Sequence, residues 1–231
     1  MERTDSPAPA SHIRSFVKRG GRLTAAQARA LAELWPRYGV EFSTGPLDLD
    51  ALFGRRAPRV VEIGFGNGEA LVELAASHPE QDFLGIEVHP PGVGHCLLGI
   101  AARGLTNVRL SRHDAIEVLQ QQIPAASIDE VLLYFPDPWP KKRHHKRRIV
   151  RMEFVAEVAT RLKHGAMLRL ATDWAPYAEA MTEVLEHCAL LENAAGAARY
   201  VGRPASRPLT RFERRGHRLG HEVFDLAYRR R

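Results

Sequence analysis

The chain has 231 residues, 45% of them hydrophobic, so it can bury a core, and this composition argues against global disorder. Its 33 lysines and arginines exceed its 27 acidic residues, and the resulting net charge of +6 favours an anionic partner. The sequence has no apolar run of about eighteen residues and no signal peptide, so we expect a cytoplasmic protein without a membrane span. Cys96 and Cys188 lack metal-binding spacing, so we expect buried reduced thiols and no metal.

The N-terminal part predicts a tail, an arm and a helix. Residues 1–13 are rich in Ser, Pro and Ala and are expected to be a flexible tail. Residues 14–23 are basic with one aromatic, and are interpreted either as an arm lying over the domain or as a disordered basic tail. Thr24 can cap the helix that we expect over residues 25–35.

The segment from Arg59 to Gly68 predicts a strand that ends in a glycine-rich turn. A helix pattern follows it, and a second strand over residues 82–88 ends at an acid. This order is the first βαβ unit of a nucleotide-binding sheet. The glycine spacing, Gly64-x-Gly66-x-Gly68, differs from the Gly-x-Gly-x-x-Gly of dinucleotide sites, so a pyrophosphate is disfavoured.

Two acids in this unit favour S-adenosylmethionine, which has no phosphates. Glu62 stands inside an apolar strand, where a carboxylate is costly without a partner, and could receive the ammonium side of the donor. The glycines would let the backbone approach the methionine moiety, and Glu87 could accept the ribose hydroxyls. The alternative is that both acids are exposed residues at strand ends.

The α/β alternation continues down the chain. We expect strands over residues 107–113, 128–135, 167–171 and 222–228, and helices over 93–103, 115–122, 150–162 and 175–191, with Gly165 closing the third of these helices. Asp114 could bind the adenine amino group or cap a helix, and Asp173 could stand at the same edge or cap a helix. Since ligands bind beyond the carboxyl ends of parallel strands, Glu62, Glu87, Asp114 and Asp137 should converge.

The segment from Phe135 to Arg148 combines a stiff loop with a basic run. Three prolines fix the backbone around Asp137 and Trp139, a geometry that suits the positioning of a planar base. Trp139 could pack on that base or act as a wedge inside the loop. Six Lys/Arg and two His follow in eight residues and predict contact with phosphates, the alternatives being a plain connector, a solvated face or a localisation signal. These residues are Lys141, Lys142, Arg143, His144, His145, Lys146, Arg147 and Arg148.

Four motifs together resemble the bacterial tRNA (guanine-N7-)-methyltransferases. They are Glu62-Ile63-Gly64-Phe65-Gly66, Phe135-Pro136-Asp137-Pro138-Trp139-Pro140-Lys141, Thr172-Asp173 and Thr210-Arg211-Phe212-Glu213, the last of which also fits a helix capping box. The resemblance covers the chain from about Arg14 to the C-terminus. It implies a class I methyltransferase fold of the α/β class, with a seven-stranded, mostly parallel sheet and helices on both faces.

The resemblance also implies an activity and a set of site residues. The activity is methyl transfer from S-adenosylmethionine to N7 of guanine 46 in the variable loop of tRNA, with Asp137 as the catalytic residue. It implies cofactor contacts at Glu62, Glu87, Asp114 and Asp137, beside the glycines Gly64, Gly66 and Gly68. It implies tRNA-side roles for Lys141, Arg143, His144, His145, Lys146, Arg147, Arg148, Asp173, Thr210, Arg211, Phe212 and Glu213.

Two other functions remain open at the level of the sequence. One is an RNA-binding module with a non-catalytic nucleotide-binding site, which the complete set of acids disfavours. The other is an NAD(P)-dependent oxidoreductase, which the glycine spacing disfavours.

Overall fold

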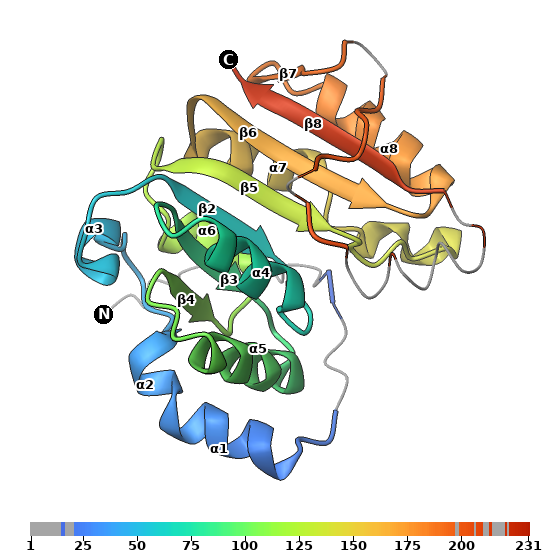
Figure 1. Ribbon diagram of the computed structural model, residues 1–231. Coiled ribbons are helices and arrows are strands. Elements are labelled where there is room, and N and C mark those ends of the chain that lie inside the picture. Colours follow the sequence, from blue (N-terminus) through green and yellow to red (C-terminus); the bar gives the residue numbers. More distant parts are fainter. Residues whose placement is uncertain are drawn as a thin grey trace, which may run out of the picture.

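A mixed β-sheet forms the centre of the computed structural model, which describes residues 15–16, 21–196, 199–205, 207–209, 213, 220 and 222–231. Within these residues the sheet has eight strands in the order β1-β4-β3-β2-β5-β6-β8-β7 (Figure 1). The strands are β1 Gly39–Val40, β2 Arg59–Ile63, β3 Asp82–Ile86, β4 Val108–Ser111, β5 Ile128–Tyr134, β6 Leu162–Thr172, β7 Leu191–Asn193 and β8 Phe224–Arg230.

The strands from β1 to β6 pair in parallel, whereas β8 is antiparallel to both β6 and β7. The expected mostly parallel sheet is therefore confirmed. The strand count differs from the expected seven, and the two-residue β1, beside β4 at the edge, is a strand that the sequence pattern did not predict. Parallel pairing brings the carboxyl ends of β2 to β6 to one edge, where ligands bind in sheets of this type.

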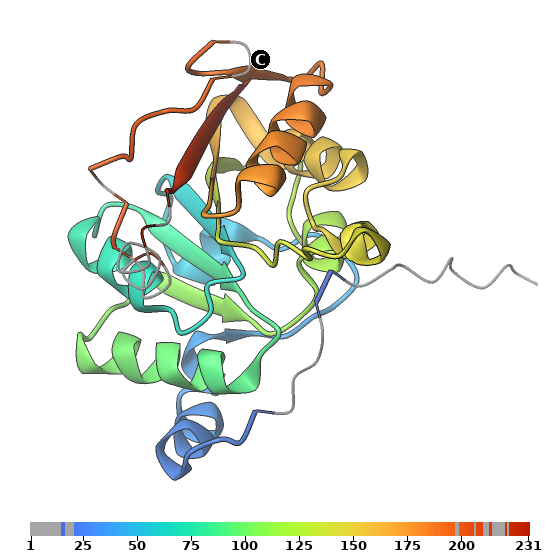
Figure 2. The ribbon, with the colours of Figure 1, turned by 90° about the vertical axis from the view of Figure 1, so that its right-hand side faces the viewer.

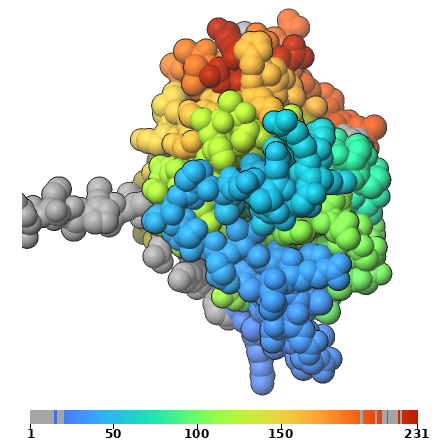
Figure 3. All heavy atoms as spheres, turned by 90° about the vertical axis from the view of Figure 1, so that its left-hand side faces the viewer, coloured from blue at the N-terminus to red at the C-terminus, as the bar shows by residue number. Residues whose placement is uncertain are grey.

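Helices cover both faces of the sheet (Figures 1 and 2). One buried cluster joins the sheet to α1 Ala25–Glu33, α2 Trp35–Tyr38, α4 Glu69–Ser77 and α5 Pro90–Ala102. A second cluster lies on the other face with α3 Leu49–Phe53, α6 Ala115–Gln121, α7 Met152–Arg161 and α8 Ala175–Glu186. The helices α1 and α2 extend as a projecting end of the molecule (Figure 3).

Several local expectations are confirmed. Thr24 caps α1, since its hydroxyl accepts from the Gln27 amide while the Gln27 side chain accepts from the Thr24 amide. Asp114 caps α6. Cys96 and Cys188 are free and buried. As a separate observation, none of the helices in the described part of the chain has the length and apolar character that spanning a bilayer requires.

Two predicted boundaries were wrong. Gly165 does not close a helix: α7 ends at Arg161, and Gly165, with φ +81°, lies inside β6, which begins at Leu162 because that residue pairs with Ile128. The last helix, α8, ends at Glu186 and does not reach the expected Leu191, because Leu191 is the first residue of β7, which pairs with β8. Both errors arise because long-range strand pairing overrides the local apolar pattern.

Candidate functional site

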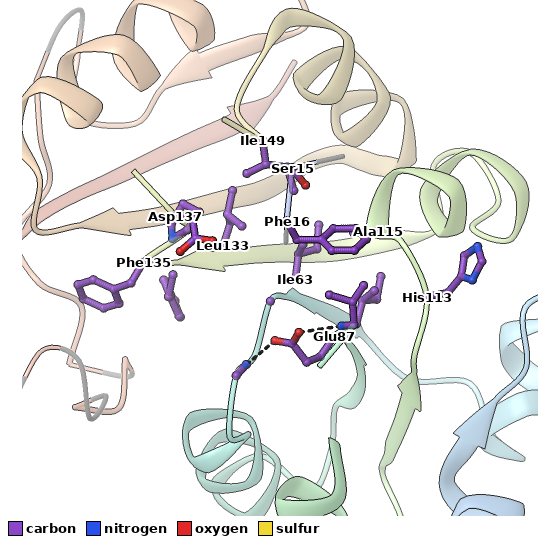
Figure 4. Close-up of a pocket in the computed structure, with 16 residues that line it drawn as sticks. Ser15, Phe16, Ile63, Glu87, His113, Ala115, Leu133, Phe135, Asp137 and Ile149 are labelled. Carbon is purple, nitrogen blue, oxygen red and sulfur yellow. Dashed lines mark hydrogen bonds between the residues drawn. The ribbon is translucent and has the colours of Figure 1, made fainter. Parts of the chain in front are cut away.

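A pocket of about 250 Å³ opens at the carboxyl ends of the parallel strands (Figure 4). Gly64 and Gly66 from the turn after β2, Glu87 from the end of β3 and Asp137 from the loop after β5 all line it. The structure therefore brings together four of the predicted site residues from three separate segments. Apolar side chains, among them Ile63, Ile86, Leu133 and Ile149, complete the wall.

The glycine turn gives the pocket a wall of bare backbone. Gly64 and Gly66 have φ angles of +72° and +59°, a region that strongly favours glycine. A Cβ atom built at either position would meet no atom within 4 Å. The glycines are thus required by the backbone conformation, and the space beside them is open to a ligand.

Gly68 serves a different purpose. It also has a positive φ, +75°, but a Cβ atom there would lie 2.4 Å from the Cys96 sulfur. Gly92 is equally tight, since its Cβ would lie 2.2 Å from the Gly66 carbonyl oxygen. Gly68 does not line the pocket, and its small size lets α4 pack against α5 and so supports the turn.

Glu87 holds the two strand ends together. Its Oε2 accepts a hydrogen bond from the Gly66 amide at 3.0 Å, and its Oε1 accepts from the Val88 amide at 2.7 Å (Figure 4). Oε1 also accepts from the His89 amide at 2.9 Å. A carboxylate offers about four acceptor positions, so capacity remains on Oε2 for a hydroxyl group of a ligand.

Glu62 and Asp114 do not line the pocket, although residues next to each of them in the sequence do. Glu62 is 3% exposed and its Oε2 has no hydrogen-bond partner in the structure. Burial, and then the nearby Glu87 carboxylate, raise the pKa of Glu62 to about 8. Asp114 is buried, and its side chain accepts from the Ile116 amide, while its neighbours His113 and Ala115 line the pocket.

The loop after β5 enters the pocket through an unusual backbone conformation. Phe135 and Trp139 have φ angles of +52° and +46°. Each such conformation costs a non-glycine residue on the order of 1–3 kcal/mol and persists only where the surroundings enforce it. The Phe135 amide donates to the Ala171 carbonyl at 2.7 Å, and the chain then turns so that Asp137 lines the pocket with an exposed side chain.

Trp139 packs inside the loop, which agrees with its interpretation as a wedge. Its indole Nε1 donates to the Ser15 carbonyl at 3.3 Å. The Arg147 guanidinium lies 5.3 Å from its ring, and the His144 ring meets it edge-on at 5.8 Å. The indole therefore joins the N-terminal segment, the loop and the basic run.

The basic run forms a 3₁₀ helix over Lys142–Arg147. Lys141, Lys142, Arg143 and Lys146 are exposed and can meet an anionic partner. His144 and His145 are partly exposed. Desolvation, followed by the nearby cations, lowers the pKa of His144, so this ring adds little charge near neutral pH.

Arg148 differs from the rest of the basic run because it is buried. Its Nε donates to the Pro138 carbonyl at 2.9 Å, and its guanidinium lies 4.6 Å from the Tyr177 ring. The structure thus assigns Arg148 to holding the proline loop, whereas the sequence grouped it with the phosphate-facing cations.

Of the remaining predicted tRNA-side residues that the structure describes, Asp173 and Glu213 do not line the pocket. Asp173 follows the carboxyl end of β6, next to the exposed Trp174. The Glu213 carboxylate is buried and ion-paired with Arg203 and Arg207. Thr210, Arg211 and Phe212, and with them the proposed capping box, lie outside the described residues, as do residues 1–13 and Arg14.

Sequence reasoning missed the part that the N-terminal arm plays in the pocket. Ser15 and Phe16 line it, and the Phe16 ring points into it near Ala115 (Figure 4). The only signal was one aromatic residue in a basic arm. Among the described residues there is no group of three or more His, Cys, Asp or Glu side chains that could hold a metal ion.

Comparisons with known proteins agree on a methyltransferase. A family described as "Putative methyltransferase" matches residues 56–226. The chain is 56% identical to the tRNA (guanine-N(7)-)-methyltransferase of Leifsonia xyli subsp. xyli, over 96% of this chain and 98% of that protein. It is 58% identical to the protein of the same name from Alkalilimnicola ehrlichii, over 99% of this chain and 97% of that protein.

Solved structures show the same fold. The 16S rRNA methyltransferase KamB has a TM-score of 0.54 at 16% identity, covering 92% of this chain and 96% of that one. The aminoglycoside resistance methyltransferase NpmB1 has a TM-score of 0.53 at 17% identity, covering 80% of this chain and 92% of that one.

Proposed function

The chain belongs to the tRNA (guanine-N(7)-)-methyltransferase family, and we propose that its pocket holds S-adenosylmethionine, its methyl donor, against guanine 46 in the variable loop of tRNA. The observation that carries this proposal is that the Gly64–Gly66 turn and Asp137 line one pocket. The family membership removes the oxidoreductase alternative.

Two features of the pocket, and one buried acid next to the pocket residue Ile63, fit the donor. Bare backbone at Gly64 and Gly66 leaves open space for the methionine part. Oε2 of Glu87 has capacity to accept from a ribose hydroxyl. Glu62 has an unpartnered oxygen behind the turn and a pKa of about 8, so a nearby ammonium group would favour its ionised form.

The chemistry requires positioning more than proton transfer. When bound, S-adenosylmethionine supplies a methyl group on a positively charged sulfur. Guanine N7 has a lone pair and no proton, so its attack needs no general base. The task of the protein is to align the two groups, and such alignment can lower the activation barrier by several kcal/mol.

Asp137 is the residue to which we assign that alignment. It is exposed at the pocket, on a loop fixed by prolines and by the left-handed Phe135. Its carboxylate orients the guanine or the amino group of the donor. It also offsets the positive charge that the purine gains on methylation.

The exposed cations of the 3₁₀ helix, together with Lys141 just before it, provide the RNA-binding surface. Lys141, Arg143 and Lys146 directly follow the loop that carries Asp137, so phosphate contacts there would place the variable loop beside the pocket. Folded tRNA is recognised largely through its shape and its phosphates, which such a surface can read.

A methyl-transfer assay tests the function. Purified protein is incubated with labelled S-adenosylmethionine and an unmodified tRNA, and the product is digested to nucleosides. We expect label in 7-methylguanosine, and none with a tRNA in which guanine 46 is replaced by adenine. Label in another nucleoside, or no label in either tRNA, would disprove the proposal.

A further inference from the structure

A buried cluster of charges stands next to the strand end that leads to Asp137, and Arg207 is at its centre. The Arg207 side chain is fully buried. Its Nη1 donates to Glu213 Oε2 at 2.6 Å and its Nη2 donates to Glu213 Oε1 at 2.9 Å. This two-bond arrangement fixes the direction of the carboxylate as well as its distance.

Two further side chains complete the cluster. Arg207 Nη2 donates to Asp225 Oδ2 at 3.0 Å, and its Nε lies 2.9 Å from Asp225 Oδ1 without hydrogen-bond geometry. Arg203 donates to Glu213 Oε1 at 3.0 Å and to the Arg207 carbonyl at 2.6 Å. The cluster thus pairs two cations with two carboxylates.

The cluster joins the C-terminal segment to the loop of the active site. Asp225 lies in β8 opposite Ala171 of β6, and the Ala171 carbonyl accepts from the Phe135 amide. The Arg207 guanidinium lies 5.7 Å from the centroids of the Tyr134 and Phe135 rings. It therefore contacts the residue whose left-handed conformation turns the chain toward Asp137.

Stability alone does not explain such a cluster. Buried ion pairs can often be replaced by apolar residues without loss of stability, because desolvating the charges offsets much of their attraction. A buried arginine also fixes the orientation of its partners, because the planar guanidinium binds carboxylates at defined angles. Phe135 needs surroundings that enforce its backbone conformation, and the Arg207 guanidinium lies beside its ring.

We propose that Arg207 is a positioning residue for methyl transfer, which holds Glu213 of the C-terminal segment and the Tyr134–Phe135 strand end in one arrangement and so fixes the place of Asp137. The proposal rests on the proposed function. It also gives Glu213 a specific role, because the Glu213 carboxylate fixes the Arg207 guanidinium and would influence methyl transfer through it.

The substitution Arg207→Lys tests this, because it keeps the charge and removes the two-bond geometry. We expect kcat at saturating tRNA to fall roughly 10- to 100-fold, as for a small misplacement of a reacting group. The KM for tRNA and the calorimetric affinity for S-adenosylhomocysteine should change little. Glu213→Gln should show the same pattern, and it decides the question if Arg207→Lys does not fold.

The matched control is Asp82→Asn, which weakens the ion pair of another buried carboxylate, with Arg55 at the amino ends of the strands. We expect it to lower Tm and to leave kcat unchanged below Tm. Any one of three results would overturn the proposal. They are a normal kcat in folded Arg207→Lys, a change in Glu213→Gln that is confined to a higher KM for tRNA, and a loss of kcat in Asp82→Asn as large as that in Arg207→Lys. Failure of the proposed function is distinct, since the unsubstituted protein would then form no 7-methylguanosine.

Discussion

The indole Nε1 of Trp139 donates a hydrogen bond to the backbone carbonyl of Ser15, which ties the Asp137 loop to the N-terminal segment. Phe16, the next residue along, lines the pocket. One hydrogen bond thus connects a wall of the candidate cofactor site with the loop that would meet the guanine.

Replacement of Trp139 by Phe keeps a large ring and removes the Nε1 donor. A hydrogen bond of this kind contributes about 1 kcal/mol, so we expect binding of S-adenosylhomocysteine to weaken by roughly fivefold as Phe16 is held less firmly. Isothermal titration calorimetry measures the change. Trp35→Phe is a suitable control because this indole bonds to Glu41, away from the pocket. Equal affinities of Trp139→Phe and the unsubstituted protein would show that the bond has no role in the cofactor site.

Glu87→Gln should weaken cofactor binding without weakening tRNA binding. The glutamine side chain has one acceptor oxygen in place of the two of the carboxylate. It therefore loses at least one of the three hydrogen bonds from backbone amides, together with the negative charge. Loss of hydrogen bonds to a charged group costs about 1.5–3 kcal/mol, or roughly 10- to 100-fold in affinity. Calorimetry with S-adenosylhomocysteine and filter binding with tRNA separate the two effects. Glu80→Gln, at an exposed acid, provides the control, and unchanged calorimetric affinity in Glu87→Gln would contradict the assignment.

Glu62→Gln tests the buried acid through the pH dependence of stability. The pKa of Glu62 is raised from 4.5 to about 8 by burial, so the folded state holds a proton that the unfolded chain releases. The stabilising contribution is complete below pH 4.5 and is lost as pH rises toward 8. We expect the variant to lack this loss. Between pH 5 and pH 8 its free energy of unfolding should therefore rise, relative to that of the unsubstituted protein, by on the order of a few kcal/mol. Urea unfolding across that range measures it, and parallel pH profiles would mean that Glu62 is ionised in the fold.

The exposed cations of the 3₁₀ helix should set the salt dependence of tRNA binding. Removal of one cation that binds a phosphate flattens the slope of log K against log salt by about 0.7–0.9. We expect Arg143→Gln combined with Lys146→Gln to lower affinity and to flatten the slope by up to two such steps. Arg56→Gln with Arg103→Gln, at exposed cations away from the pocket, should leave the slope unchanged. An unaltered slope in the first pair would show that the 3₁₀ helix faces away from the RNA.

Local patterns allowed much of this site to be predicted from the sequence. The Gly64–Gly66 turn was predictable because a strand, a turn and a helix follow one another within a short segment, and each leaves its own pattern. Prolines around Asp137 signalled a stiff loop for the same reason. The edge where these segments meet followed from parallel pairing alone.

Other features depend on contacts between distant segments and left no local signal. Arg148 stands in a basic run, yet it turns inward because the Pro138 carbonyl and the Tyr177 ring are within its reach. Gly68 lies in the glycine motif, but its close neighbour is Cys96 of α5. Arg207 has no pattern of its own, and its partners Glu213 and Asp225 meet it only in the folded chain.

The role of Asp137 is tested most directly by the single-turnover rate of methyl transfer by Asp137→Ala, measured with saturating tRNA and S-adenosylmethionine. Asp137 is exposed, so the variant should fold, as its Tm will verify. We expect the rate to fall roughly 100-fold or more, because the residue that aligns the guanine is gone. A rate near that of the unsubstituted protein would show that Asp137 does not align the reacting groups at this pocket.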